Sequence, residues 1–391
     1  MSGRPLHAVV LPTGPALYDH LRAALGGGPA IMPIDPGLPP PARDQLIESM
    51  RPAAVVTAAG EHARNDGLPV AGDVAVVMAT SGSTGAPKGV ELTGAALQHS
   101  ARATLDRVGA RPGDRWLCCL PTAHVGGLQV LVRSLLTGTD PVMLERFAVP
   151  AVAAAVASGA VEHLALVPTT LHRLLDAGVD LSRLRSVLVG GAALSADLLA
   201  RARPAGVPVV ATYGMTETAG GCCYDGLALD GVEVRLDGSG RIHFAGPLLA
   251  RGYRLRPDLT AGSFVDGWLV TPDVGQLEAD GRLTVLGRAD DVIVSGGVKV
   301  AAGAIADLLA THAAVAEASV LARPDPEWGQ RVVAVVVPAD PTAPPTLAEL
   351  RAHVSATRTA AAAPAELVLT DALPVLPSGK IDRLALKGLL G

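Results

Sequence analysis

This chain of 391 residues has few aromatic side chains (3%) and few charged ones (18%), and its formal net charge is only −5. It has no basic block or basic–aromatic stripe, which argues against a nucleic-acid partner. No apolar run approaches the roughly 20 residues that a membrane-spanning helix requires. The start at Met1 leads into no apolar segment with a cleavage site, as a secretory signal would. We therefore expect a cytoplasmic protein without a membrane span.

Cysteine is also rare, because the chain has only four, in the adjacent pairs Cys118-Cys119 and Cys222-Cys223. Neighbouring cysteines seldom form a disulfide with each other, and no C-x-x-C spacing suits zinc. The sequence therefore predicts small buried thiols in a reducing compartment.

Hydrophobic residues, by contrast, make up 49% of the chain, which is typical of a globular protein. The length suffices for two or three domains. Short apolar strands alternate with helices, except that residues 232–286 read as short strands and turns. The sequence thus predicts an α/β fold with a β-rich subdomain.

The segment 81–89 is a loop rich in hydroxyl groups and glycine, with one lysine, Lys88, near its end. It follows the apolar run 74–79, which predicts a β-strand. Backbone N–H groups and hydroxyls of such a loop can surround phosphate oxygens, and the lysine adds positive charge. Because Pro87 precedes Lys88 and Gly89 follows it, this is not a Walker A loop. The alternative is a flexible linker, since these residue types are common in loops.

Two more candidate loops, 190–194 and 213–218, follow the predicted strands 187–189 and 207–212. The carboxyl ends of strands are where α/β folds bind ligands. The second loop offers an aromatic face, a glycine, a hydroxyl for phosphate and a carboxylate suited to Mg²⁺. A strand-to-helix turn with a capping threonine is the alternative. In combination with the phosphate loop, the pattern favours a nucleotide site.

Later segments carry weaker signals. Asp273 stands at the end of a predicted strand, where a carboxylate can accept both hydroxyls of a ribose, although aspartate is common in surface turns. The segment 287–297 is a charged cluster of short side chains ahead of the predicted helix 301–310. The segment 377–383 reads as a turn that presents Lys380. Without other evidence, a lysine in such a turn is interpreted as solvent-exposed and without a function.

Arg133 is the one charge in the predicted helix 128–136. A charge in so apolar a segment is costly unless it is paired or reaches solvent. It is therefore either a structural cation, paired or extended to the surface, or a receptor for an anionic substrate. His124, just before this helix, is either a structural histidine or part of the site.

Five blocks match the adenylate-forming superfamily of acyl- and aryl-CoA ligases, luciferases and peptide-synthetase adenylation domains, in that family's order. The blocks are 81–89, 190–194, 213–218, 287–297 and 377–383. The chain is identified as a member from about residue 70 onward. The resemblance implies a large N-terminal domain of α/β layers, 1–288, and a small mobile α+β C-terminal domain, 289–391, which swivels about Asp290.

The resemblance also assigns roles to matching positions. The phosphate loop would be lined by Ser81, Ser83, Thr84, Gly85 and Lys88. The adenine would lie by Gly191, Ala192 and Tyr213, the α-phosphate by Thr216, and the ribose by Asp273 and Arg288, and Gly214 would also belong to the nucleotide site. Glu217 would bind Mg²⁺, and the catalytic residues would be Lys380, Lys88, Glu217 and His124.

The implied reaction has two halves. Lys380 would bridge the acyl carboxylate and ATP, where together with Mg²⁺ it offsets the charge of two anions. After acyl-AMP forms, the swivel would remove Lys380 and bring Ser295, Gly296 and Gly297 to a tunnel for the pantetheine arm of CoA. The expected co-substrates are therefore ATP and CoA, with Mg²⁺.

The compactness of the chain resembles the o-succinylbenzoate–CoA ligases of menaquinone synthesis in actinobacteria, and the segments 121–128 and 213–226 are similar to theirs. This acid is a dicarboxylate, so its second carboxylate requires a cation, for which Arg133 is suited. The acid would lie among His124, Arg133, Gly191 and Gly220.

Departures from the family pattern concern the later steps. Pro272 stands where the family has glycine and removes one N–H, and Ala304 and Ala306 replace acidic residues. Both bear on the thioester half-reaction. The alternatives are another aryl- or acyl-CoA ligase, an adenylation enzyme that loads a carrier protein, and a nucleotide-binding regulatory protein with a degenerate site.

Overall fold

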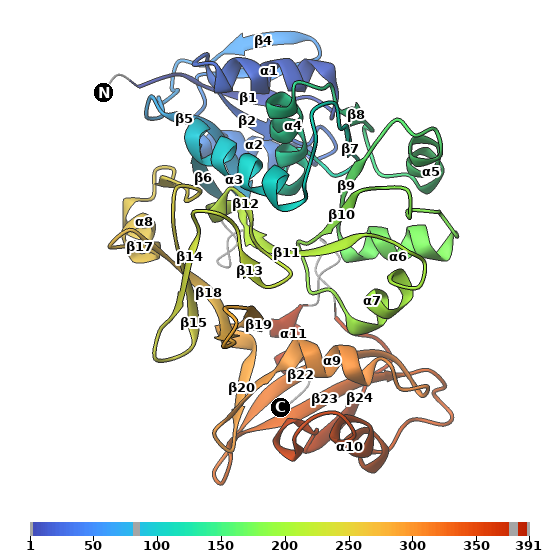
Figure 1. Ribbon diagram of the computed structural model, residues 1–391. Coiled ribbons are helices and arrows are strands. Elements are labelled where there is room, and N and C mark those ends of the chain that lie inside the picture. The colour runs from blue at the N-terminus through green and yellow to red at the C-terminus, as the bar shows by residue number, and fades with distance from the viewer. Residues whose placement is uncertain (1–2, 81–86, 375–381, 389–391) are drawn as a thin grey trace. The chain divides into compact units, whose positions relative to one another are not determined.

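The computed structural model describes residues 3–80, 87–374 and 382–388 (Figure 1). The predicted site residues Ser81, Ser83, Thr84, Gly85 and Lys380 lie outside this part of the chain. The chain divides into two compact units. Unit 1 comprises 1–235, 243–270 and 279–283, and unit 2 comprises 236–242, 271–278 and 284–391.

Unit 1 contains two seven-stranded sheets. The first has the strand order β16 (Gly252–Tyr253), β6 (Lys88–Thr93), β5 (Val74–Thr80), β2 (Ala30–Ile34), β1 (Leu6–Val10), β3 (Ala54–Thr57) and β4 (Gly60–Ala63). Strand β1 pairs in parallel with β2 and β3, whereas β6 runs antiparallel to both β5 and β16. Thr80 at the end of β5 therefore lies opposite Lys88 at the start of β6.

The second sheet has the order β13 (Leu227–Ala228), β12 (Gly220–Tyr224), β11 (Val209–Met215), β10 (Ser186–Val189), β9 (His163–Leu166), β7 (Trp116–Cys118) and β8 (Val142–Met143). Strands β8, β7, β9, β10 and β11 are parallel, and β12 returns antiparallel to β11. All residues of β7, β9 and β10 are buried, as expected for parallel strands that are covered on both faces.

Two helices, α3 (Gly94–Arg107) and α4 (Val125–Thr137), lie between these sheets (Figure 1). Helix α3 contacts β5 and β6, α4 contacts β7 and β9, and both contact β12. Their buried side chains share one core with α1 (Pro15–Leu25). Helix α3 is capped by Thr93, whose hydroxyl accepts a hydrogen bond from the Ala96 N–H at 3.0 Å.

The outer face of each sheet has its own helices. Helix α2 (Pro40–Met50) packs on the first sheet through Leu46, Ile47 and Met50. The second sheet is covered by α5 (Val149–Ala157), α6 (Pro168–Asp176) and α7 (Ala196–Ala202). Because side chains alternate along a strand, Leu117 points to this outer core, whereas Trp116 points to the α3–α4 layer. The predicted α/β layers are confirmed.

The predicted β-rich segment is also confirmed. A five-stranded sheet has the order β14 (Glu233–Leu236), β15 (Arg241–Ala245), β18 (Trp268–Leu277) and β17 (Phe264–Val265), with β19 (Leu283–Arg288) paired to β18. Helix α8 (Pro257–Ser263) precedes β17. Each of β14, β15, β18 and β19 begins in one unit and ends in the other.

The remainder of unit 2 is an α+β arrangement, as predicted. Its sheet consists of β21 (Val298–Ala301), β20 (Val292–Ser295), β23 (Gly329–Pro338), β22 (Val315–Asp325) and β24 (Glu366–Leu369). Helices α9 (Ala302–Leu309) and α10 (Leu347–Ser355) form one core with the sheet, and Leu386 of α11 (Arg383–Gly388) belongs to another. Over the described ranges, no helix is long and apolar enough to cross a membrane.

Two segments differ from the sequence prediction. Strand β11 extends to Met215, so Tyr213 and Gly214 are strand residues and not part of a following loop. The segment 287–297 contains β20, which forms a hairpin with β21 before α9 begins. The valine-rich flanks of Gly296-Gly297 favour strands, which explains this hairpin. The four cysteines are free and buried, as predicted.

Gly127, in the first turn of α4, provides a test of the packing that places this helix. A Cβ atom at Gly127 would lie 2.4 Å from the Pro121 carbonyl oxygen. Because that atom belongs to the backbone, Gly127→Ala should lower the free energy of unfolding by about 1–3 kcal/mol in urea titrations. Gly126 is the matched control, since its Cβ would meet only Leu120 Cδ1, at 3.6 Å. Gly126→Ala should be neutral or stabilise by up to ~1 kcal/mol, and equal losses in both variants would contradict the close approach.

Candidate active site

Of the five site residues predicted in the phosphate loop, Lys88 is the one that the structure describes. It is half-buried at the start of β6. Its Nζ atom lies 5.6 Å from the centroid of the Tyr253 ring, which is within the range of a cation–π contact. Strand β16 lies beside β6 in the first sheet, and the pairing of these two strands brings Lys88 and Tyr253 together.

The predicted glycine turn at 190–194 lies against β11. A Cβ atom at Gly190 would be 2.1 Å from Thr212 Oγ1, so only glycine permits this approach. Gly191 has φ +81°, which also favours glycine. Gly191 and Ala192 are exposed. The Tyr213 ring, next to Thr212, lies 5.9 Å from the Phe244 ring, between centroids. The structure therefore brings the turn and Tyr213 to neighbouring strands of one sheet.

A tight reversal joins β11 to β12 and carries Thr216 and Glu217. A Cβ atom at Gly214 would lie 2.1 Å from the Gly220 carbonyl oxygen, so the two strands approach as closely as backbone allows. The Thr218 hydroxyl accepts from the Met215 N–H at 3.0 Å and donates to the Gly220 carbonyl at 2.7 Å. These bonds hold the short helix Thr216–Thr218 at the end of β11.

The side chain and the backbone of Glu217 are both bonded to the segment 250–253. The Tyr253 hydroxyl donates to Glu217 Oε1 at 2.8 Å, and the Ala250 N–H donates to the Glu217 carbonyl at 2.8 Å. Burial, followed by the neighbouring Glu217 carboxylate, raises the pKa of Tyr253 well above its ordinary value, so the phenol is a donor at neutral pH. The sequence interpretation missed Tyr253.

The donor set around Glu217 fits magnesium. Within the part of the chain that the structure describes, no three His, Cys, Asp or Glu side chains gather as metal ligands. Mg²⁺ needs no such cage, because it keeps several waters and binds through one or two carboxylates together with substrate phosphates. A site with Glu217 as its one protein carboxylate is therefore compatible with magnesium.

Arg133 is buried in α4, with 4% of its surface exposed. Its Cζ atom lies 4.2 Å from the centroid of the Trp116 ring. No carboxylate forms an ion pair with it among the described residues, and its buried Nε has no hydrogen-bond partner there. Burial lowers the pKa of Arg133, which the nearby Tyr224 and Cys118 oppose. Arg133 thus neither reaches solvent nor sits in a structural salt bridge.

The Trp116 ring contacts Arg133 and also stacks with a histidine. The His163 ring stacks on Trp116 with the centroids 4.7 Å apart. His163 Nε2 lies 3.0 Å from Asp114 Oδ2, and His163 Nδ1 lies 2.8 Å from Ser186 Oγ. This fixes the imidazole, and through it the indole beneath Arg133.

Gln129 lies one helical turn before Arg133 and was also missed. Its Nε2 donates to the Ala219 carbonyl at 2.6 Å, which ties α4 to the turn that ends at Gly220. A Cβ atom at Gly220 would lie 3.2 Å from Gln129 Cγ. His124 is exposed at the other end of α4. Since an α-helix rises about 1.5 Å per residue, His124 and Arg133 stand about 13 Å apart along its axis.

The other predicted residues belong to unit 2. Asp273 is half-buried in β18 and its N–H donates to Thr271 Oγ1 at 3.1 Å, while Pro272 is exposed beside it. Arg288 ends β19, and Asp290 follows in the short helix Ala289–Asp291. Ser295 ends β20, and Gly296 and Gly297 form the turn to β21, with φ +57° and +78°. Ala304 and Ala306 lie on α9.

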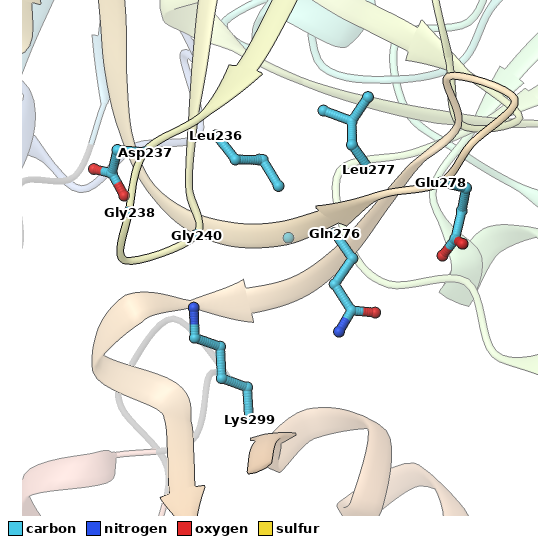
Figure 2. A pocket seen from close by; sticks show the side chains of 9 residues that line it. Leu236, Asp237, Gly238, Gly240, Gln276, Leu277, Glu278 and Lys299 are labelled. Carbon is cyan, nitrogen blue, oxygen red and sulfur yellow. The ribbon is translucent and has the colours of Figure 1, made fainter. Parts of the chain in front are cut away.

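Unit 2 also has an open pocket of about 480 Å³ between the β14–β15 turn and the end of β18 (Figure 2). Its lining includes Asp237, Gln276, Glu278 and Lys299. The Lys299 ammonium donates to the Ser239 carbonyl. Of the predicted catalytic residues that the structure describes, Lys88, Glu217 and His124, none lines this pocket.

The arrangement is that of an adenylate-forming enzyme. A glycine turn lies beside the strand end Tyr-Gly-Met-Thr-Glu, Tyr253 links that strand end to the phosphate-loop lysine, and an α+β unit follows. Comparison with family models agrees with this class. The model of the AMP-binding enzyme matches residues 62–254, and that of the AMP-binding enzyme C-terminal domain matches residues 304–380. The chain belongs to this AMP-binding enzyme family.

Individual relatives narrow the comparison. A protein named "Probable 2-succinylbenzoate–CoA ligase" of Mycobacterium tuberculosis (strain CDC 1551 / Oshkosh) is 41% identical over 97% of each chain. The o-succinylbenzoate CoA synthetase (MenE) of Bacillus subtilis, in complex with the acyl-adenylate intermediate OSB-AMP, superposes with a TM-score of 0.84 at 28% identity, covering 99% of this chain and 89% of that one. The same enzyme with ATP and a magnesium ion gives 0.84 at 27% identity, covering 99% and 90%.

The network behind Arg133 predicts a pH dependence of stability. Burial lowers the pKa of His163, and its bond to Asp114 only partly opposes this. The unfolded chain therefore binds a proton at His163 more readily than the folded chain does. The contribution of the neutral His163 to the free energy of unfolding is complete above about pH 6.5 and falls as the pH drops toward the pKa of His163 in the folded state. The free energy of unfolding, measured by urea titration at pH 8 and pH 5.5, should fall more in the wild type than in His163→Gln. Parallel curves would contradict a neutral buried imidazole.

Proposed function

We propose that this chain is an AMP-forming acid–thiol ligase that converts o-succinylbenzoate to o-succinylbenzoyl-CoA in menaquinone biosynthesis. It consumes ATP and CoA, uses Mg²⁺ and works in the cytoplasm, which the four free thiols support. The observation that carries the choice of acid is the buried Arg133, a cation without a carboxylate among the described residues. The relatives named for the same dicarboxylic acid support it.

In the first half-reaction a carboxylate oxygen of the acid attacks the α-phosphorus of ATP, and pyrophosphate leaves. Two anions must meet, so the site needs positive charge that is already in place. Lys88 supplies it at the phosphates and Lys380 at the reacting carboxylate, while Thr216 donates to the α-phosphate. Mg²⁺, when bound through Glu217, adds positive charge at the phosphates.

In the second half-reaction the CoA sulfur attacks the acyl carbon, and AMP leaves. A swivel about Asp290 replaces Lys380 by the β20–β21 turn, where Ser295, Gly296 and Gly297 line the path of the pantetheine arm. Both residues of this turn are glycines, as their positive φ favours, so they have no side chain that would block the arm.

Arg133 receives the carboxylate that is not activated. A guanidinium can donate two parallel hydrogen bonds to a carboxylate, and the Trp116 ring fixes its plane. In this buried position the attraction is stronger than in water, and a monocarboxylic acid would leave the cation unpaired.

Arg133→Met tests this assignment by pyrophosphate release with o-succinylbenzoate, benzoate, succinate and a medium-chain fatty acid. The wild type should turn over o-succinylbenzoate well ahead of the others. Hydrogen bonds to a charged group contribute about 1.5–3 kcal/mol, so their loss should raise KM for o-succinylbenzoate about 10- to 150-fold. KM for ATP should not change. An unchanged KM for the acid would remove Arg133 from the pocket, and turnover only with another acid would overturn the proposed substrate.

Lys380→Ala separates the two half-reactions. Removing one preorganised charge from the transition state should lower the rate of acyl-AMP formation by about 10²–10³-fold. Transfer to CoA from supplied acyl-AMP should remain near the wild-type rate. Both rates can be followed by quenched-flow with separated products. Equal loss in the two halves would contradict the role proposed for Lys380.

A further inference from the structure

The backbone at Tyr253 is fixed from several directions. Strand β16 pairs with β6, with Tyr253 opposite Val90, and the Arg254 N–H donates to the Gly89 carbonyl at 2.7 Å. The Tyr253 N–H donates to Thr260 Oγ1 of α8 at 2.9 Å. These hydrogen bonds fix the position of the Tyr253 Cα atom and the direction in which its side chain leaves the backbone.

Arg254 anchors the same segment from the opposite side. It is 3% exposed, and its guanidinium donates to the carbonyls of Met50 at 2.6 Å and Leu68 at 2.6 Å. It also lies 3.6 Å from the Glu91 carboxylate. A buried, multiply bonded arginine of this kind is a rigid part of the structure, so Tyr253 is attached to a fixed frame.

The Tyr253 ring contacts two groups of opposite charge. Its hydroxyl donates to Glu217 Oε1 at 2.8 Å, and Lys88 Nζ lies 5.6 Å from its centroid. Glu217 Oε2, in contrast, makes no hydrogen bond within the ranges that the structure describes. One carboxylate oxygen is therefore held by the protein, and the other is available to a ligand.

We infer that Tyr253 is a positioning residue that orients Glu217 toward a divalent cation through its hydroxyl and places Lys88 at the nucleotide phosphates through its ring. This inference rests on the proposed function, because it concerns the same ATP site. A partner that holds a metal-ligating carboxylate typically affects metal affinity or activity about 10- to 100-fold when it is removed. The phenol suits the task because it is neutral and can donate without competing for the metal.

Two variants separate the two contacts. Tyr253→Phe removes only the hydrogen bond to Glu217 and keeps the ring beside Lys88 and Phe264, whose ring centroid is 6.0 Å away. Tyr253→Leu removes both contacts. Tyr18→Phe is the matched control, because it deletes the hydroxyl of another buried tyrosine, on α1.

The experiment is calorimetric titration of ATP into each full-length variant, once with Mg²⁺ and once with EDTA, beside a Tm measurement. In the wild type and Tyr18→Phe, Mg²⁺ should tighten ATP binding. In Tyr253→Phe this gain should shrink by about tenfold while the affinity in EDTA is unchanged. Tyr253→Leu should also bind ATP more weakly in EDTA. Binding of Mn²⁺ with ATP, followed by the electron paramagnetic resonance of free Mn²⁺, should show the same order.

Three results would overturn the inference. If Tyr253→Phe keeps the full Mg²⁺ gain, the hydrogen bond does not position Glu217. If it loses affinity equally with Mg²⁺ and with EDTA, Tyr253 is structural only. If the wild type binds no ATP at all, the proposed function fails and the inference fails with it, a result that is distinct from the other two.

Discussion

The tight reversal between β11 and β12 is the constraint on which the candidate site depends. Gly214 and Gly220 bring the two strands so close that no side chain fits between them. Gln129 of α4 bonds to this turn from one side, and the segment 250–253 bonds to Glu217 from another. The direction of the Glu217 carboxylate is thus set by three elements that are distant in sequence.

Arg133 is a charge held in the protein interior, and its burial costs free energy as long as no ligand pairs with it. A guanidinium without an ion-pair partner in a core loses hydration that the Trp116 ring replaces only in part. The stacked His163, bonded to Asp114 and Ser186, keeps the indole in place. The same low polarity that makes the free cation costly strengthens its attraction to an anion. In the proposed site, the selectivity for a dicarboxylate and the cost of burying the unpaired cation would therefore have one physical origin.

Much of the fold could be predicted because local signals agreed with the long-range structure. Thr93 and Pro168 mark helix starts, and the apolar runs before residues 81 and 190 are buried strands. The β20–β21 hairpin was missed because its strands have only four residues each, so that the charged residues and glycines of 287–297 dominated the pattern although the flanking valines favour strands. In the candidate site, the motifs predicted Lys88 and Glu217, both of which contact Tyr253 in the structure. Tyr253, Gln129 and Trp116 were not identified, since their roles exist only through contacts with residues far along the chain. The only local signal for Gln129 was that it is a polar residue in an apolar helix, one turn before Arg133.

The third sheet has a consequence for dissecting the molecule. Strands β14, β15, β18 and β19 each contribute to both compact units, and unit 2 includes the separate segments 236–242 and 271–278. No single cut in the chain therefore yields two complete pieces. A fragment that begins after residue 288 would lack the earlier parts of unit 2, which include the segments 236–242 and 271–278, and a chimera with its crossover there would join these parts of one parent to the remainder of unit 2 from the other. Exchange of the small unit between relatives would require several matched junctions.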